Sequence, residues 1–380
     1  MKFNEEEGVE YLYCKSCYSL EEFGSKILKS KFIEITRGPN SNCVEIEDIF
    51  YCPTSKVPMD AKNFFSINDY YLESIPIFMG NYPETGVEFE ELTKKSVGAS
   101  YLGTMRADVD NLGLIFSSGL DKSFRSLSRI STMSLLFSLF FKNYVNILAK
   151  DRIPENLKLS ILGGNVKNPQ GKNIVIVYSG GDDLFVTGAW NDVITFTIEL
   201  SKLFSKFTSY NPSLSISAGI TLTPPKYPIY RIAQLAGEAE EKSKDVEGKA
   251  SLTMLGSTYK WTEWVNIIED ILLPLLNMGK FSDDEHRKFK PDFPRTLIYK
   301  LLQLHKDFEK AMAENKKDDA YFVLPRISYV LGRSTPKKYY EEWSKFASKA
   351  VSINLDETFD WLIKIKSPLI WVDYLSRGGE

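Results

Sequence analysis

Two adjacent carboxylates follow a pair of glycines in the middle of the chain. Residues 179 to 183 read Ser-Gly-Gly-Asp-Asp, and the apolar runs Asn173 to Tyr178 and Leu184 to Thr187 lie on either side. Because glycine enters positive φ without steric cost, the pattern predicts a tight β-hairpin with Asp182 and Asp183 at its tip. Adjacent acids repel each other and favour a hard cation that binds oxygen, such as Mg²⁺ or Mn²⁺. This chemistry indicates a role with nucleotides.

A second acidic element lies on an earlier strand, predicted over Tyr101 to Val109. Asp108 and Asp110 are two residues apart, so on a strand they share a face. Acids on neighbouring strands that meet at one sheet edge can hold two metal ions about 3.5 to 4 Å apart for phosphoryl transfer. We expect Asp183 to share a metal ion with Asp108, and Asp182 to face a second nucleotide or its 3′-hydroxyl. The alternative is a polar hairpin turn with capping acids.

The elements that must position these acids follow a regular order after residue 100. Strand, helix, hairpin, helix and strand give the order βαββαβ, with one more helix and strand appended, which is typical of a ferredoxin-like fold. The predicted elements are the strand Tyr101 to Val109, a helix Ser123 to Ala149, the hairpin Asn173 to Thr187, a helix Asp192 to Phe207, a strand Leu214 to Leu222, a helix Tyr230 to Asp245 and a strand Ala250 to Leu255.

The regions on either side differ in pattern, so we expect an α+β protein of three units. Residues 1–97 read as a small mixed module with short strands such as Phe32 to Thr36, and they hold all four cysteines. Residues 98–260 carry the ferredoxin-like unit. Residues 261–380 show apolar positions at helical spacing with no strand signal, interrupted by residues such as Pro294 and Pro325, and predict an all-α bundle.

Composition limits the class of protein. With a net charge of −3, the chain is not a general nucleic-acid-coating protein, so any RNA contact must be local. No stretch approaches the roughly 20 apolar residues that span a bilayer. The acidic start of the chain lacks a signal-peptide core, so we expect a cytoplasmic protein with no membrane partner. Four cysteines without a secretory signal make disulfides unexpected.

Several motifs in this order resemble the large catalytic subunit of type III CRISPR effector complexes, closest to the Csm branch. The resemblance covers most of residues 10 to 260. It is carried by Arg106-Ala-Asp108-Val-Asp110-Asn111-Leu-Gly113 with Ile115-Phe116, Ser128-Arg129, Ser179-Gly180-Gly181-Asp182-Asp183, Ser215-Ile-Ser217-Ala-Gly219, Ala239-Glu240-Glu241-Lys242-Ser243-Lys244 and Gly248-Lys249.

The resemblance implies a palm domain of the polymerase and cyclase type. Such a domain joins ATP molecules through 3′-5′ linkages into cyclic oligoadenylate when the complex binds target RNA. Asp108, Asp182 and Asp183 match the metal-binding acids, and the last two are the expected catalytic pair. Lys244 and Lys249 match positions near the triphosphate, although either lysine could instead lie on a solvated face. Phosphate would also approach the backbone of the Ser179, Gly180 and Gly181 turn, unless these residues only make the turn.

The same resemblance implies partners: other effector subunits, crRNA, target RNA and ATP. Full-length members also carry an HD nuclease domain and a first palm. Here His286 and His305 are not followed by Asp, so we expect no DNA cleavage from this chain and read both as residues on helix surfaces. A site between two palms would then need a separate chain with the HD and first palm domains, or a second copy of this chain.

A zinc ion is a further candidate. Tyr13-Cys14-Lys-Ser-Cys17 resembles half of the zinc-binding linker before this palm, and tetrahedral zinc needs two more thiolates. Cys43 and Cys52 are candidates, although their nine-residue separation is not a knuckle spacing. The alternative is reduced thiols without a metal.

The helical third carries no catalytic motif, and the resemblance implies a bundle that packs along the RNA-binding backbone of the complex. Basic clusters could touch phosphate or could be solvated helix ends, and we expect the tryptophans to be core or subunit-contact residues. The clusters are His286-Arg287-Lys288 with Lys290, and Arg333 with Lys337-Lys338.

Two other functions stay open. A diguanylate-cyclase-like palm also presents Gly-Gly-acid-acid, but here Asp-Leu stands where that family prefers Glu-Phe. The chain could also be a non-catalytic scaffold of the effector.

Overall fold

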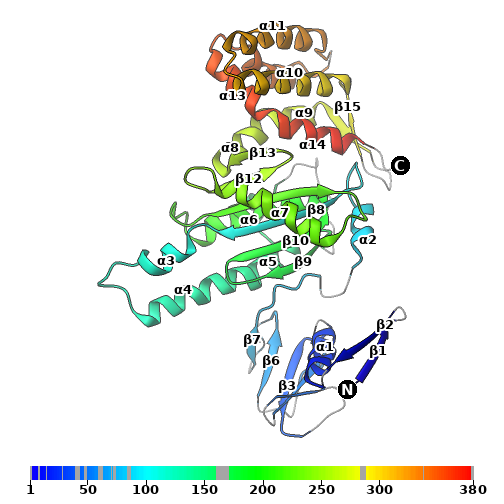
Figure 1. The fold of residues 1–380 in the computed structure, drawn as a ribbon, viewed down its shortest axis with the longest axis vertical. Helices are drawn as coiled ribbons and strands as arrows, with labels where there is room; N and C mark the ends of the chain where they lie inside the picture. Colours follow the sequence, from blue (N-terminus) through cyan, green and yellow to red (C-terminus); the bar gives the residue numbers. More distant parts are fainter. Residues whose placement is uncertain are drawn as a thin grey trace.

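The computed structural model shows three regions arranged along the longest axis, with the helical region at one end, a sheet in the middle and a smaller β region at the other end (Figure 1). Among the described residues, no helix has the length and apolar character needed to cross a membrane. The structure describes residues 2–6, 9–13, 15–27, 29–38, 43–46, 49–58, 63–69, 71, 74–83, 87–159, 171–282, 288–336 and 338–377.

The middle region is built on a six-stranded sheet of order β13-β12-β11-β8-β10-β9. The segment β11-β8-β10-β9 is antiparallel throughout and has the strand order of the ferredoxin-like fold, as predicted. β12 then joins β11 in parallel, and β13, which the sequence analysis missed, pairs with β12. The strands are β8 (Leu102–Val109), β9 (Ile174–Ser179), β10 (Asp183–Ala189), β11 (Ile216–Thr223), β12 (Ser251–Met254) and β13 (Ser257–Lys260).

Helices α6 (Trp190–Phe207) and α7 (Ile229–Lys244) confirm two predicted helices and cover opposite faces of this sheet. A Cβ at Gly103 of β8 would lie 2.8 Å from the Cα of Trp190, at the start of α6. On the other face, a Cβ at Gly219 of β11 would lie even closer to the backbone of α7, 2.1 Å from the amide nitrogen of Glu240. Because successive strand residues point to opposite faces, Arg106 and Asp108 of β8 lie on the α7 side.

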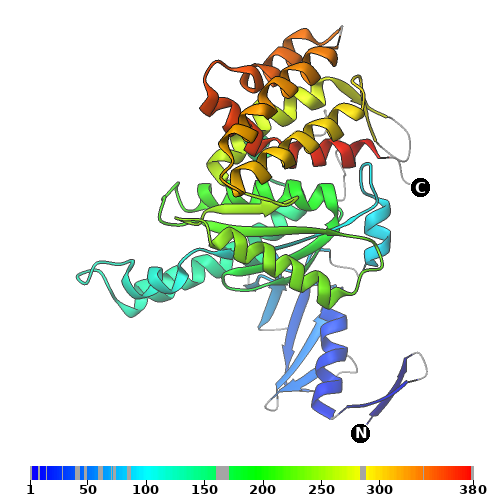
Figure 2. The same cartoon turned by 45° about the horizontal axis from the view of Figure 1, so that its top comes forward.

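The long helix predicted over Ser123 to Ala149 begins at Leu127, because the Ser126 side chain caps it by accepting the amide of Arg129. It runs as α4 (Leu127–Leu139), a π-helical turn η1 (Phe140–Tyr144) and α5 (Val145–Ala149). A short helix α3 (Leu112–Ser118) precedes it. In Figure 2, α3 and α4 project from the sheet as an arm.

The amino-terminal region holds a five-stranded sheet of order β4-β5-β3-β6-β7. A disulfide joins Cys43 to Cys52, which corrects our expectation of reduced thiols, since strand pairing of β4 with β5 brings the two cysteines together. The elements are β1 (Lys2–Glu6), β2 (Val9–Tyr13), α1 (Lys15–Ile27), β3 (Phe32–Thr36), β4 (Val44–Ile46), β5 (Ile49–Thr54), β6 (Phe64–Ile67), β7 (Ile75–Ile77) and the connecting helix α2 (Phe89–Lys94).

The carboxy-terminal region is helical, as predicted, with two corrections. A small hairpin of β14 (Gly279–Phe281) and β15 (Phe289–Pro291) interrupts it, and Pro325 lies inside α11 instead of ending it. The helices are α8 (Trp261–Ile267), the π-helical η3 (Ile268–Leu272), α9 (Leu273–Asn277), α10 (Thr296–Ala313), α11 (Lys317–Arg333), α12 (Tyr340–Ser348), α13 (Leu355–Lys364) and α14 (Lys366–Ser376).

The sheet and the bundle share one hydrophobic core. Trp264, Trp361 and Trp371 are buried in it, in agreement with the prediction that the tryptophans are core or subunit-contact residues. The indole of Trp261 donates a 2.7 Å hydrogen bond to the carbonyl of Ile216, at the start of β11. The bundle therefore braces the sheet along β11, one of the strands beside the acids.

Candidate active site at the rim of the central sheet

The structure brings the acids of two separate segments to one rim of the sheet. Asp183, the first residue of β10, pairs with Asp108 across the β10–β8 ladder. The carbonyl of Asp182 accepts a 3.1 Å hydrogen bond from the amide of Val109, so the hairpin tip lies against the end of β8. Three carboxylates from distant parts of the sequence therefore occupy one edge.

The carboxylates at this rim repel one another. Partial burial and the charges of Asp108 and Asp183 raise the pKa of Asp182, while Lys244 acts in the opposite direction. The ammonium of Lys244 lies 2.6 Å from Asp108 Oδ2. Burial would lower the pKa of Lys244, but its hydrogen bonds to Asp108 and Glu240 outweigh burial and raise it. One lysine thus offsets only part of the negative charge, and the rim favours a further cation.

The two glycines of the turn have different roles. Neither has positive φ among the described residues, which corrects the reason we gave for the glycine pair. A Cβ on Gly180 would overlap the hydroxyl of Tyr178 and lie 2.7 Å from Asp183 Oδ1, whereas a Cβ on Gly181 would meet nothing within 4 Å. The Tyr178 hydroxyl is hydrogen-bonded to Asp183, whose charge raises the pKa of that hydroxyl. Gly180 is therefore required by a close approach of side chains, and Gly181 leaves open space.

Ser179 anchors the hairpin. Its hydroxyl donates a short hydrogen bond to the carbonyl of Phe141, in the π-helical turn η1, and Gly80 packs closely against its side chain. The Ser179 hydroxyl therefore already has a partner, whereas our prediction concerned an approach of phosphate to the backbone of this turn. Any phosphate contact at this position falls to the backbone.

The loop before β12 forms the second side of the rim. Gly248, Lys249 and Ala250 have consecutive φ values of 77°, 51° and 51°, and Asn111 has a φ of 56°. The Lys249 ammonium donates a 2.8 Å hydrogen bond to Asn111 Oδ1. Non-glycine residues at positive φ are strained and cluster at functional sites. Lys249 is thus held at the same end of β8 as Lys244.

Asp110 has a structural role that the sequence analysis missed. Its side chain is buried, and its Oδ2 accepts hydrogen bonds from the Ser215 hydroxyl at 2.6 Å and the Ala250 amide at 3.1 Å. It follows the last residue of β8 and ties the β11 and β12 ends of the sheet to that strand. Asp110 therefore shapes the strained loop and does not contact Lys244 as Asp108 does.

Glu240 is a second residue to which the sequence analysis gave no role. Its carboxylate lies 2.6 Å from the Lys244 ammonium and 3.2 Å from Arg106 Nε. The spacing of Glu240 and Lys244, four residues apart on a predicted helix, was a signal for this contact.

A metal site made of protein ligands alone is not present in the described parts of the chain, where no three His, Cys, Asp or Glu side chains group around one point. The rim acids still fit Mg²⁺, which is usually bound by one or two carboxylates with substrate phosphates and water completing its shell.

The structure does not test the prediction of zinc at Cys14 and Cys17. Cys14 and the side chain of Cys17 lie outside the described residues, and Cys43 and Cys52 are bonded to each other.

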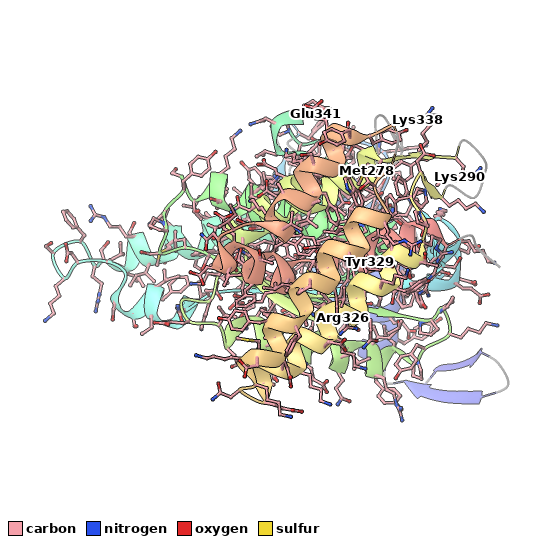
Figure 3. The ribbon with its side chains drawn as sticks, turned by 90° about the horizontal axis from the view of Figure 1, so that it is seen from above. Met278, Lys290, Arg326, Tyr329, Lys338 and Glu341 are labelled. Carbon is pink, nitrogen blue, oxygen red and sulfur yellow. A yellow bond between two sulfur atoms is a disulfide. The ribbon has the colours of Figure 1, made fainter. Side chains whose placement is uncertain are left out.

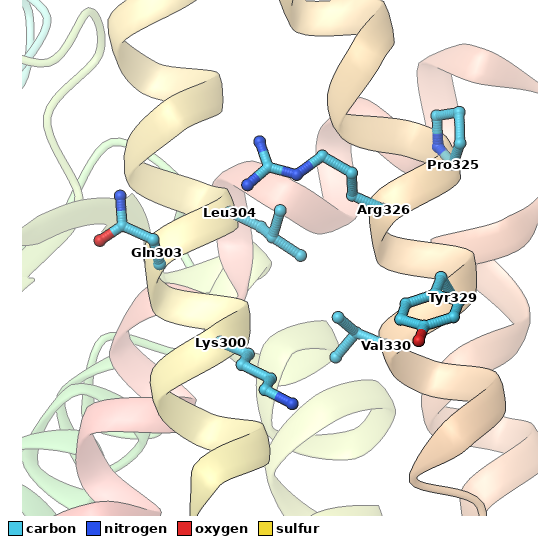
Figure 4. Close-up of a pocket in the computed structure, with 7 residues that line it drawn as sticks. All are labelled: Lys300, Gln303, Leu304, Pro325, Arg326, Tyr329 and Val330. Carbon is cyan, nitrogen blue, oxygen red and sulfur yellow. The ribbon is translucent and has the colours of Figure 1, made fainter.

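The helical bundle carries a separate groove of about 360 Å³ between α10 and α11, lined by Lys300, Gln303, Leu304, Pro325, Arg326, Tyr329 and Val330 (Figure 4). Arg326 is paired there with Asp307 at 3.1 Å. Arg326 and Tyr329 face the viewer when the molecule is seen from above (Figure 3), and Figure 1 shows α10 and α11 at the end of the molecule away from β9 and β10. Nothing in this groove joins the rim acids.

The structure describes one of the two histidines. His305 is buried, which corrects its reading as a surface residue, and its Nδ1 lies 2.8 Å from the carbonyl of Leu362. His286 and Arg287 lie outside the described residues, as does Lys337.

Known proteins share this architecture. Residues 101–253 match the family model of the Cas10/Cmr2 second palm domain. The single-strand-specific deoxyribonuclease Cas10/Csm1 (subtype III-A) of Mycobacterium tuberculosis is 36% identical over 236 residues, which are 60% of this chain and 27% of that protein. Its Streptococcus thermophilus counterpart is 31% identical over 331 residues, 82% of this chain and 38% of that protein. The chain thus spans about a quarter to two fifths of the length of these relatives.

Solved structures agree at the level of the fold. Csm1 of T. onnurineus superposes with a TM-score of 0.68 over 93% of this chain and 49% of that one, at 22% identity. A Csm1–Csm4 cassette in complex with one ATP has a TM-score of 0.62, and one in complex with cA4 has 0.59, each over 93% of this chain and 50% of that one at 22% identity. Through residues 101–253, this chain carries a palm that belongs to the Cas10/Cmr2 second palm domain family.

Proposed function

We propose that this chain is the palm-bearing part of a type III CRISPR large subunit that joins ATP into cyclic oligoadenylate by metal-dependent 3′-5′ nucleotidyl transfer when target RNA is bound. The observation that carries the proposal is the convergence of Asp108, Asp182 and Asp183 at one rim, with Lys244 and Lys249 beside them. This is the charge pattern that a divalent cation and a triphosphate require.

The residues divide the chemistry between them. Asp108, Asp182 and Asp183 would hold Mg²⁺ or Mn²⁺, which would activate the attacking 3′-hydroxyl and stabilise the leaving pyrophosphate. Lys244 and Lys249 would neutralise the triphosphate, and the open backbone at Gly181 would let phosphate approach the turn. Asp110 and Asn111 hold the Lys249 loop in its strained form, and this fixes the lysine before the substrate arrives.

The relatives support a proposal about the partners. Since solved Csm1 structures include cassettes with Csm4, we propose that this chain assembles with other type III subunits, crRNA and target RNA. A second palm, from a separate chain that carries the HD nuclease and first palm domains, would complete the cradle for the second nucleotide. We propose residues 1–97, 98–260 and 261–380 as the functional units, and zinc at Cys14 and Cys17 remains a proposal.

The test is product analysis with labelled ATP or GTP and Mg²⁺, using the chain alone and in the assembled complex with complementary RNA. Cyclic adenylate that disappears in the double variant Asp182→Ala, Asp183→Ala supports the proposal, provided that the variant still assembles. A cyclic guanylate would indicate a diguanylate-cyclase-like protein. Assembly without any product would indicate a scaffold.

A further inference from the structure

The charged side chains on α7 and β8 form a row of alternating positive and negative charge. Arg106 contacts Glu240 at 3.2 Å, Glu240 contacts Lys244 at 2.6 Å, and Lys244 contacts Asp108 at 2.6 Å. Each carboxylate in this row has a cation beside it. At one end of this row, Asp108 lies next to Asp182, which forms no ion pair among the described residues and is repelled by Asp108 and Asp183.

Glu240 is held firmly, whereas Lys244 has freedom to move. The Glu240 side chain is only 8% exposed, and its two oxygens face two different cations. The Lys244 side chain is 28% exposed and ends on a flexible four-carbon stem. Of the two, the lysine is therefore the group that can change partners.

Two glycines allow α7 to pack closely against the sheet beside these ion pairs. At Gly219 any Cβ would overlap the backbone of Glu240, and at Gly237 a Cβ would lie 3.1 Å from the Arg106 guanidinium. The hydroxyl of Ser243 also ties the end of α7 to β11 through a 2.9 Å hydrogen bond to the carbonyl of Ala218. Helix α7 is thus pressed onto the sheet where Glu240 must reach between two cations.

We propose that Lys244 is an exchangeable counter-ion that Glu240 retains. Without nucleotide, its ammonium neutralises Asp108. When a divalent cation and a triphosphate arrive, the cation takes over Asp108 and the ammonium turns to the phosphates, while Glu240 keeps it within reach. Glu240 is then a positioning residue that acts through Lys244. This inference rests on the proposed function, since it assigns the order in which that site fills.

The first experiment measures Mn²⁺ binding by the chain without nucleotide, from the electron paramagnetic resonance signal of free Mn²⁺. In Lys244→Met the competing ammonium is gone, so Mn²⁺ should bind roughly three- to tenfold more tightly, the effect of one partly exposed ion pair. A non-hydrolysable ATP analogue with Mn²⁺ should bind roughly tenfold more weakly to the same variant, because a phosphate partner is lost. These opposite signs are not expected from a purely structural lysine.

The second experiment tests Glu240. Glu240→Gln should weaken analogue binding roughly three- to tenfold, since the lysine is no longer retained. Glu241→Gln, which removes the same charge from the adjacent exposed position, should change it little. In the Lys244→Met background, the effect of Glu240→Gln should shrink to that of Glu241→Gln, because Glu240 acts through the lysine.

Three groups of results separate the possible failures. Unchanged or weaker Mn²⁺ binding in Lys244→Met, or an equal effect of Glu240→Gln with and without the lysine, would overturn this inference alone. Wild-type protein without Mn²⁺ binding, or with binding that Asp108→Asn leaves intact, would overturn the proposed function as well. The expected binding pattern without any adenylate product would leave the counter-ion exchange standing and remove the synthase. Should Glu240→Gln fail to fold, the sign of the Mn²⁺ change in Lys244→Met still decides.

Discussion

The β9–β10 hairpin has an acidic group at each end, and the two groups satisfy their charges differently. At the base, Asp192 Oδ2 accepts 2.8 Å hydrogen bonds from the amide and the side chain of Asn173. Glu199 lies 2.8 Å from the ammonium of Lys172 and also accepts the amide of Leu159 at 2.8 Å. Each of these buried carboxylates therefore has protein donors of its own.

At the tip, the part of the chain that the structure describes supplies one ammonium in contact with the three carboxylates, that of Lys244 on Asp108. Burial raises the pKa of Asp192 at the base, where bonds from Asn173 counteract it. At the tip the pKa of Asp182 is raised by burial and by two neighbouring acids, with only Lys244 acting against them. The carboxylates at the base thus stabilise the fold, whereas those at the tip leave negative charge that is still to be neutralised.

The comparison indicates that satisfaction of charge, more than residue type, separates a structural acid from a candidate catalytic one. A buried carboxylate with several donors stabilises its neighbourhood, whereas partly exposed carboxylates that repel one another cost stability and gain from a ligand.

The largest contrast should appear in activity. In the assembled complex, Asp182→Asn with Asp183→Asn should lower adenylate formation by about 10³-fold or more, because ligands of the reacting centre are lost together. The unfolding midpoint should stay equal or rise, since repulsion is relieved. Asp245→Asn, on the exposed end of α7, is the matched control. An active double variant would remove the tip from catalysis.

The base should show the reverse pattern, a loss of stability. Lys172→Met leaves Glu199 buried without its cation and should lower the free energy of unfolding by about 3 to 5 kcal/mol in urea titrations. Lys158→Met is the control, because its partner Glu155 is mostly exposed and its other partner, Asp151, is partly exposed and keeps its contact with Lys172. This variant should cost less than about 1 kcal/mol. Equal losses in the two variants would contradict the assignment of the base as structural.

The two glycines sharpen the comparison within the tip. Gly180→Ala would force the Tyr178 hydroxyl and the Asp183 carboxylate apart, so it should lower the free energy of unfolding by about 1 kcal/mol. Gly181→Ala faces open space and should change it by less than about 0.5 kcal/mol. Urea unfolding measures both, and a costlier Gly181→Ala would show that the turn is packed differently.

The smallest effect concerns pH. Because the folded protein raises the pKa of Asp182 above 3.8, it binds the proton more tightly than the unfolded chain does. Stability contributed by the protonated form is then lost as pH rises from 3.8 through the folded pKa. Asp182→Asn should therefore be more stable than wild type at neutral pH, by roughly 1 °C in the unfolding midpoint, with the gap closing toward acid. A gap that widens toward acid would contradict the direction.

Strand alternation was enough to predict much of the sheet. The apolar runs around Gly180 and Gly181 gave the β9–β10 hairpin, and the order of elements gave the ferredoxin-like strand order that sets Asp183 beside Asp108. The resemblance named the acids and lysines of the rim. Short features without a repeating pattern were missed, such as β13 and the β14–β15 hairpin, because a few residues carry too weak a periodic signal.

Contacts between distant segments could not be predicted from the pattern of residues along the sequence. Nothing in the local sequence distinguishes Asp110, tied to Ser215 and Ala250, from Asp108, which faces Lys244. The pairing of Cys43 with Cys52 likewise depends on how β4 and β5 align.

By itself the sequence determined which elements form and which residues can carry charge at the sheet rim, since periodicity and residue type act over a few neighbouring positions. Only the tertiary structure decided which carboxylates are satisfied. A carboxylate is satisfied when donors from other parts of the chain reach it. Packing brings such donors, Lys172, Arg106 and Lys244, within about 3 Å of Glu199, Glu240 and Asp108.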